Sequence, residues 1–193
     1  MIFKRFQFNK QEIIFDKVQQ TEARRILKDA PIMWRRINSI GVILDCNSTY
    51  AAKLGYGKSE IIGKVIFEHV PKEAWSEMNE SLQRWFETGE VSHRKITLKR
   101  QDGSIFPVLL HAVSLYDENN HLLGSNTVIF DLTELENDKI KEYEKFFKNA
   151  EIRLDEISKD YEKLDENTRS EYDGLKKMFD LLSSTNLYEL KNL

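Results

Sequence analysis

The chain has 193 residues, enough for one domain of about 100 to 150 residues with appendages, or for two small domains. Its 29 Lys and Arg residues stand against 32 Asp and Glu, and a net charge of -3 provides no general attraction for nucleic acid or an anionic membrane. The single cysteine excludes a disulfide framework and any metal cluster held by several cysteines. We therefore expect neither a multidomain enzyme nor a nucleic-acid or membrane partner.

The most apolar segment, residues 105–113, is far shorter than the roughly 20 residues of a membrane-spanning helix. The first residues also lack the basic and then apolar pattern of a secretory leader. These two observations predict a cytoplasmic protein.

Charge and chain-breaking residues divide the sequence into three zones. Residues 1–30 are predicted to be an N-terminal flank with a helix over about 10–28. Residues 31–133 hold every proline and tryptophan and seven of the eight glycines, which is typical of a compact mixed domain. Residues 134–193 hold 16 acidic and 11 basic side chains and no proline, which predicts one long solvated helix.

Within the central zone, apolar period and chain breakers predict the elements in chain order. Gly55, Gly63 and Gly89 each follow a helical pattern, because glycine takes the left-handed conformation after a helix at least cost. From Val91 the apolar period becomes two, which predicts strands. The predicted elements are strands at 32–37 and 42–44, helices at 48–54, 58–62 and from Pro71 to Gly89, and three strands between 91 and 132. Helices set against an antiparallel sheet make this an α+β fold.

Five segments of the central zone occur in the order and spacing of a known family. They are DCNSTYAAKLGY (45–56), SEIIGK (59–64), RWFETGE (84–90), KRQDGSIFPVLL (99–110) and VIFDLTE (128–134). On these segments the zone resembles a PAS domain of the PAS/PAC sensor family, S-box type. The resemblance implies a five-stranded antiparallel sheet in the order 2-1-5-4-3, whose concave face and flanking helices enclose a pocket. It also implies that Asp131, Leu132 and Thr133 form the junction where the last strand passes a signal to an exiting helix.

Two polar residues near strand ends have both a structural and a functional interpretation. The Asp131 carboxylate can accept backbone N–H groups or pair with a base, and so fix the angle between strand and helix. It can equally be an ordinary helix cap. Asn47 falls where the family favours Asn, yet any Asn after a strand can form a local turn bond.

Apolar residues of the tail recur at steps of three and four, which predicts a coiled-coil seam and a parallel homodimer. The seam residues are Ile140, Tyr143, Phe147, Ala150, Leu154, Ile157, Tyr161 and Leu164. Beyond Leu164 the spacing changes and residues 165–174 are poor helix formers, which predicts a hendecad or a break. The alternative is a helical hairpin or packing on the sensor domain, because the aromatic seam residues are bulky for a tight dimer.

No residue pattern predicts catalysis or a metal site. The four histidines lack the spacing of a zinc helix, and the tail lacks the His-Glu pair that accepts phosphate in sensor kinases. Flavin-photoreceptor members of the family carry a reactive cysteine where this chain has IFEHVPKEAW, and Cys46 is interpreted as a small buried hydrophobe. Met78 stands where oxygen-sensing members hold haem iron with His, and we interpret it as a core residue. Neither haem nor flavin is expected, and His111 is expected to point away from the pocket.

The expected pocket lining is apolar apart from two hydroxyls on the last strand. Its residues are Trp75, Met78, Leu82, Ile96, Leu98, Ser125, Thr127 and Ile129. The hydroxyls can orient a polar ligand, or they can bond each other and water in a filled pocket. The sequence therefore predicts a non-enzymatic signalling sensor that binds a small ligand or partner and signals to a downstream protein through helical dimerisation. The alternatives are a sensor fragment of a histidine kinase or cyclase, and a ligand-free dimerisation adaptor.

Overall fold

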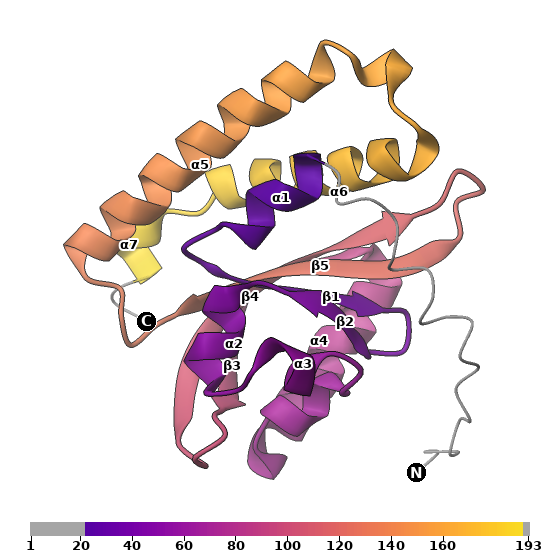
Figure 1. Cartoon of the computed structure of the whole chain (residues 1–193). Helices are drawn as coiled ribbons and strands as arrows, with labels where there is room; N and C mark the ends of the chain where they lie inside the picture. The colour runs from indigo at the N-terminus through magenta and orange to yellow at the C-terminus, as the bar shows by residue number, and fades with distance from the viewer. Residues whose placement is uncertain (1–21, 191–193) are drawn as a thin grey trace.

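The computed structural model describes residues 22–190, and its centre is one antiparallel sheet (Figure 1). The strands are β1 (Met33–Asn38), β2 (Ile43–Cys46), β3 (Glu90–Lys99), β4 (Ile105–Tyr116) and β5 (Leu122–Asp131). They lie in the order β2-β1-β5-β4-β3, and every neighbouring pair is antiparallel. The expected α+β class and the strand order implied by the resemblance are therefore confirmed.

The chain between β2 and β3 forms the helical layer on one side of the sheet (Figure 1). Its elements are α2 (Ser48–Leu54), α3 (Lys58–Ile61), η2 (Ile66–His69), η3 (Lys72–Ala74) and α4 (Trp75–Thr88). Gly55 and Gly89 follow α2 and α4 with φ angles of 78° and 75°, which are left-handed. The helix ends predicted from glycine are therefore present.

The N-terminal and C-terminal flanks form a second helical layer on the opposite side of the sheet (Figure 1). Its elements are α1 (Glu22–Lys28), α5 (Asn137–Ser158), η4 (Tyr161–Lys163), α6 (Glu166–Ser183) and α7 (Leu187–Leu190). The end of the predicted N-terminal helix is present as α1, and its first part lies outside the described residues. No helix within residues 22–190 is long and apolar enough to cross a membrane.

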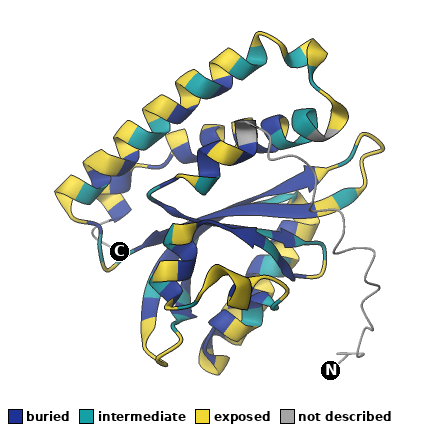
Figure 2. Cartoon of the chain, in the orientation of Figure 1, coloured by how far each residue is buried: buried dark blue, intermediate teal, exposed yellow. Residues whose placement is uncertain are grey.

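The sheet separates two apolar cores, because successive residues of a strand face opposite sides. On β1, Met33 and Ile37 belong to the core with α2, α3 and α4, whereas Trp34 belongs to the core with the flanking helices. Residues of β4 and β5 are buried along nearly their whole length (Figure 2). We call the side with α2 to α4 the inner face and the side with the flanks the outer face.

The tail differs from the single long helix predicted for residues 134–193. The chain leaves α5 after Ser158, and α6 begins at Glu166, with Asp165 as its N-cap accepting from the backbone N–H of Thr168. The α6 helix then returns along the outer face of the sheet (Figure 1). A break is favoured where aspartate side chains compete with the helix backbone for hydrogen bonds. The sequence predicted the break within residues 165–174, whereas α5 ends earlier, at Ser158.

The predicted seam residues pack within their own chain. The α5 helix, which carries most of them, contacts α1, α6 and α7, and the rings of Tyr143 and Phe147 contact Phe130 of β5. Four of them, Ile140, Tyr143, Ala150 and Leu154, are buried in the outer core. Phe147, Ile157 and Tyr161 are partly buried against the same core, and Leu164 is partly exposed. The coiled coil is not confirmed, and the homodimer, about which a single chain says nothing, stays a prediction.

Gly174 shows why α6 can approach the sheet so closely. It had contributed to the prediction of a weak helical stretch, yet it lies in the middle of α6. A Cβ atom at this position would overlap the Leu115 side chain of β4. The glycine therefore reduces helix propensity but permits close packing of helix on sheet.

Candidate functional site

The inner face of the sheet encloses a small cavity beneath α4, with a volume of about 20 Å³. Such a volume holds roughly one water-sized group. Its lining comes from β1, β3, β4, β5 and the helical layer: Arg35, Ile37, Ile66, Met78, Ser81, Leu82, Trp85, Val91, Leu110, Ala112, Ser125 and Thr127. This is the pocket position that the PAS resemblance implied.

The structure brings together only part of the predicted lining. Met78, Leu82, Ser125 and Thr127 line the cavity. Three others, Ile96, Leu98 and Ile129, are buried in the same inner core without lining it. Trp75 is 39% exposed, and its indole N–H donates to the Val70 carbonyl oxygen, so it lies outside the cavity.

Arg35 is the one charged residue among the cavity-lining residues that sequence reasoning missed. It is 2% exposed, and its Nη1 donates to the Tyr50 hydroxyl over 3.0 Å. The Tyr50 hydroxyl in turn lies 3.2 Å from Nδ1 of His69. The missed signal was the alternation of β1, which places Arg35 between Met33 and Ile37 on an otherwise apolar face.

The two aromatic partners of Arg35 provide no negative charge at neutral pH. Burial, together with the nearby Arg35 and two lysines, lowers the pKa of His69 to about 4. Burial also raises the pKa of Tyr50, although Arg35 opposes this effect. Tyr50 and His69 are therefore neutral while Arg35 is cationic.

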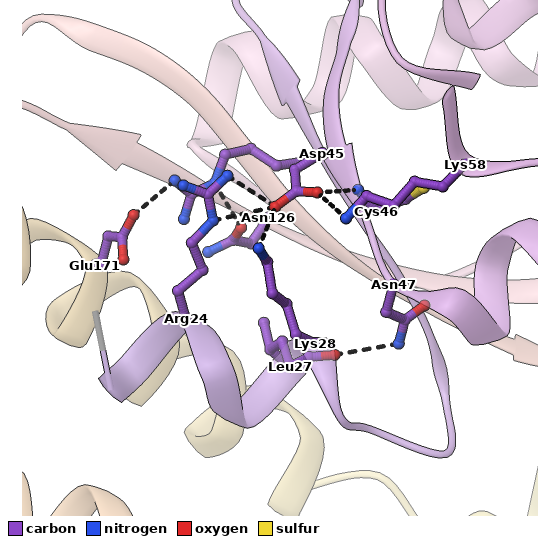
Figure 3. Close-up of polar contacts among 10 residues, drawn as sticks. Arg24, Leu27, Lys28, Asp45, Cys46, Asn47, Lys58, Asn126 and Glu171 are labelled. Atoms are coloured by element: carbon purple, nitrogen blue, oxygen red, sulfur yellow. Dashed lines mark hydrogen bonds and ion pairs between the residues drawn. The ribbon is translucent and has the colours of Figure 1, made fainter. Parts of the chain in front are cut away.

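The next residue of β1 faces the opposite side and binds the tail. Nη1 of Arg36 forms an ion pair with Oε1 of Glu171 on α6 at 2.8 Å, and its Nε donates to Oδ1 of Asn126 at 3.2 Å. Figure 3 shows Asn126 and Glu171 on either side of this contact. The side chains of Arg36 and Glu171 are only 12% and 14% exposed. The β1 strand therefore lines the cavity with Arg35 and binds α6 with Arg36.

Asp45 on β2 holds α1 against the domain (Figure 3). Its Oδ2 lies 2.7 Å from Nη2 of Arg24 and 3.6 Å from Nζ of Lys28, and its Oδ1 lies 2.6 Å from Nζ of Lys58. Burial would raise the pKa of Asp45, but the hydrogen bond from Lys58 and the three positive charges hold that pKa below its usual value. The carboxylate is thus the shared counter-ion of three cations from two helices.

Asn47 joins the same flank to β1 through its side-chain amide. Its Nδ2 donates to the carbonyl oxygens of Leu27 and Ile32, and its Oδ1 accepts from the backbone of Trp34 and Tyr50. Figure 3 shows the contact with Leu27. The local turn bond that sequence allowed for Asn47 is therefore part of a larger bridge between α1, β1 and α2.

A larger depression of about 430 Å³ lies beside Asp45 and is open to solvent. Its charged lining residues are Lys28 and Lys58, whose amines bind Asp45. It also contains Cys46, which is buried, and burial raises the pKa of this thiol to about 11. A thiol with such a pKa is a poor nucleophile.

Asp131 lies at the end of β5 with its carboxylate almost fully buried. Its Oδ1 accepts from the backbone N–H and the hydroxyl of Thr133, at 2.9 and 2.6 Å. Its Oδ2 lies 3.6 Å from Nη2 of Arg100 and 4.0 Å from Nζ of Lys53. Asp131 therefore stabilises the turn after β5, whereas the N-cap of α5 is Glu136.

His111 points to the outer face, where its ring contacts Phe130 and His93. Burial and the neighbouring His93 lower its pKa to about 3. Met78, the residue at the family's haem-ligand position, is buried in the inner core. Within residues 22–190, no group of three or more His, Cys, Asp or Glu side chains could hold a metal ion.

Comparison with known proteins agrees with this geometry. A family model described as a PAS domain matches residues 29–134, which is more than half of the chain. The PAS domain of a Colwellia psychrerythraea protein is similar, with a TM-score of 0.51 and 19% identity over 55% of this chain and 91% of that chain. A search of curated proteins found no match.

Two structures of light-oxygen-voltage proteins are similar to a comparable extent. One, studied with a flavin analogue, has a TM-score of 0.51 and 21% identity, over 66% of this chain and 93% of that chain. The other, an RNA-binding light-oxygen-voltage receptor, has a TM-score of 0.52 and 16% identity, over 65% of this chain and 35% of that chain. At these identities the likeness concerns the fold alone.

Proposed function

Because the chain belongs to the PAS domain family, we propose that it is a sensor module that binds a small ligand on the inner face of its sheet. The helices on the outer face report the bound state to a downstream protein. No catalytic step is part of this proposal, since none of the residues that line the cavity is a His, Cys, Asp or Glu that could act as a general base.

One observation carries the proposal. Of two neighbouring residue pairs between β1 and β5, one faces the cavity on the inner face and the next faces α6 on the outer face. Arg35 pairs with Thr127, and both line the cavity. The next pair, Arg36 with Asn126, is hydrogen-bonded and binds Glu171 of α6. A ligand that displaces the first pair strains the second, because the two pairs share one backbone.

The proposal needs no second copy of the chain. Seven of the eight apolar residues that predicted a dimer seam are buried or partly buried in the outer core of their own chain. Movement of β1 or β5 can therefore reach α6 within one chain. A ligand shifts the position of α6 only to the extent that it binds one arrangement more tightly than the other.

Amide chemical shifts in a ¹⁵N–¹H NMR titration test this coupling. The probes are a panel of small anionic, neutral and cationic solutes, and the variants are Glu171→Gln and the matched control Glu151→Gln, at an exposed position of α5. We expect at least one solute to shift the amides of β1 and β5 and also those of α6. The α6 shifts should shrink in Glu171→Gln and persist in the control.

Two results would contradict the proposal. The first is that no solute shifts the amides that surround the cavity. The second is that shifts at β1 and β5 occur without any response in α6, or with the same response when Glu171 is replaced.

A further inference from the structure

We propose that the cavity on the inner face is an anion site, and that its ligand is a small monocarboxylate held by Arg35 and Ser125. This inference rests on the proposed function, because it names the ligand class of the same pocket. It is carried by the unpaired charge and hydroxyl that the cavity contains.

Arg35 is a buried cation without a counter-ion among the described residues. Its Nε has no hydrogen-bond partner, and no Asp or Glu within residues 22–190 forms an ion pair with it. Its Nη1 donates to the Tyr50 hydroxyl, and the guanidinium carbon lies 5.7 Å from the centre of the Tyr50 ring. A buried charge is costly unless it is paired, so the missing partner is an anion.

Ser125 is a second unpaired polar group in the same cavity. It is 1% exposed, and its Oγ has no hydrogen-bond partner in the described part of the chain. It lies on β5, two residues from Thr127, which pairs with Arg35 across the strands. A guanidinium N–H and a hydroxyl O–H are both donors, and a carboxylate accepts from both.

The charge and size of the cavity restrict the ligand further. Its twelve lining residues include one cation and no acidic side chain. A volume of about 20 Å³ holds roughly one water-sized group, so the lining has to move outward even for the smallest organic anions, formate and acetate. Met78 and Leu82 form part of the lining, and the unbranched methionine side chain can move aside for a methyl group.

The test compares formate and acetate with formamide and acetamide, which have nearly the same shape without the charge. Binding is followed by NMR titration of the full chain, with ionic strength held constant by sodium sulfate. We expect saturable shifts at β1 and β5 with the acids, and binding weaker by roughly tenfold or more with the amides, as loss of a charged hydrogen bond implies.

Substitutions at the two donors locate the site. Arg35→Met and Ser125→Ala should each weaken acetate binding, the first to below detection. Arg84→Met, at an exposed position of α4, is the matched control and should bind acetate as the unaltered chain does. Arg35→Met should fold, because it replaces an unpaired buried charge by an apolar side chain of similar length.

Three results would overturn the inference. They are equal binding of acetate and acetamide, equal binding of chloride and formate, and unchanged acetate binding in Arg35→Met or, should that variant not fold, in Ser125→Ala. Water and the Tyr50 ring would then satisfy Arg35. A neutral solute that binds the cavity and shifts α6 would leave the proposed function intact, whereas acetate binding without an α6 response would contradict only the proposed function.

Discussion

Met178 distinguishes the observed arrangement of the tail from an extended coiled coil. It lies on α6, is 0% exposed and belongs to the outer core. In the seam spacing continued from Leu164, residues 175, 179 and 182 would face a partner helix and Met178 would not. Truncation of a buried Met to Ala lowers the free energy of unfolding by about 2 to 5 kcal/mol. Met178→Ala should therefore lower the melting temperature by roughly 4 to 20 °C in a chain of this length.

Urea unfolding followed by circular dichroism measures this change, with Lys176→Ala as the control. Lys176 is exposed on the same helix, and its truncation should change stability by about 0.5 kcal/mol or less. Hydrogen exchange of residues 171–182 provides a second measurement, because α6 can detach without global unfolding. The reasoning is refuted if Met178→Ala and Lys176→Ala are equally stable and equally protected in α6.

Three further changes have defined outcomes. The pKa of His111 is about 3 in the folded chain and 6.5 ordinarily, so on acidification the unfolded chain binds the proton first. The free energy of unfolding should therefore fall by about 2 kcal/mol as the pH drops from 6.5 to 5. In urea titrations His111→Phe should weaken this dependence, and replacement of the exposed His121 should not. Gly124→Ala should destabilise the chain by roughly 2 to 5 kcal/mol in urea, because φ is +149° and a Cβ would overlap the Ile37 carbonyl oxygen. Asp131→Ala should speed hydrogen exchange in the first turns of α5 and leave β3 and β4 unchanged, since it removes the acceptor of the turn after β5.

Local chemistry made much of the fold predictable. Gly55 and Gly89 terminate helices because their conformation is costly for other residues, and this information is contained in single residues. The apolar period of two after Val91 correctly indicated strands, since successive side chains of a strand point to opposite faces of the sheet. The strand order required the family resemblance, because pairing between distant strands leaves no local pattern.

The tail shows what apolar spacing does not specify. The positions from Ile140 to Leu154 predicted which side of α5 is buried, but spacing identifies a face and not the surface that covers it. The covering surface is formed by α1, α6 and α7, together with the Phe130 ring of β5.

Charged residues inside the fold were the least predictable feature of the candidate site. Arg35 and Arg36 are adjacent in sequence, yet one lies in the cavity and the other binds Glu171, which is 135 residues away. Asp45 likewise forms ion pairs with basic side chains of α1 and α3. Such pairs depend on tertiary contacts, and only the interruption of an apolar alternation by Arg35 could have been read from the sequence.

The most direct test of the central claim is whether α6 lies on the sheet of its own chain. The nuclear Overhauser effect between the Leu115 methyl groups and the Gly174 Hα protons reports this contact, which the absence of a side chain at Gly174 makes close. We predict a strong signal in uniformly labelled protein, and none in the isotope-filtered spectrum of mixed labelled and unlabelled chains. Absence of the signal in the labelled protein, or its appearance between labelled and unlabelled chains, would contradict the account.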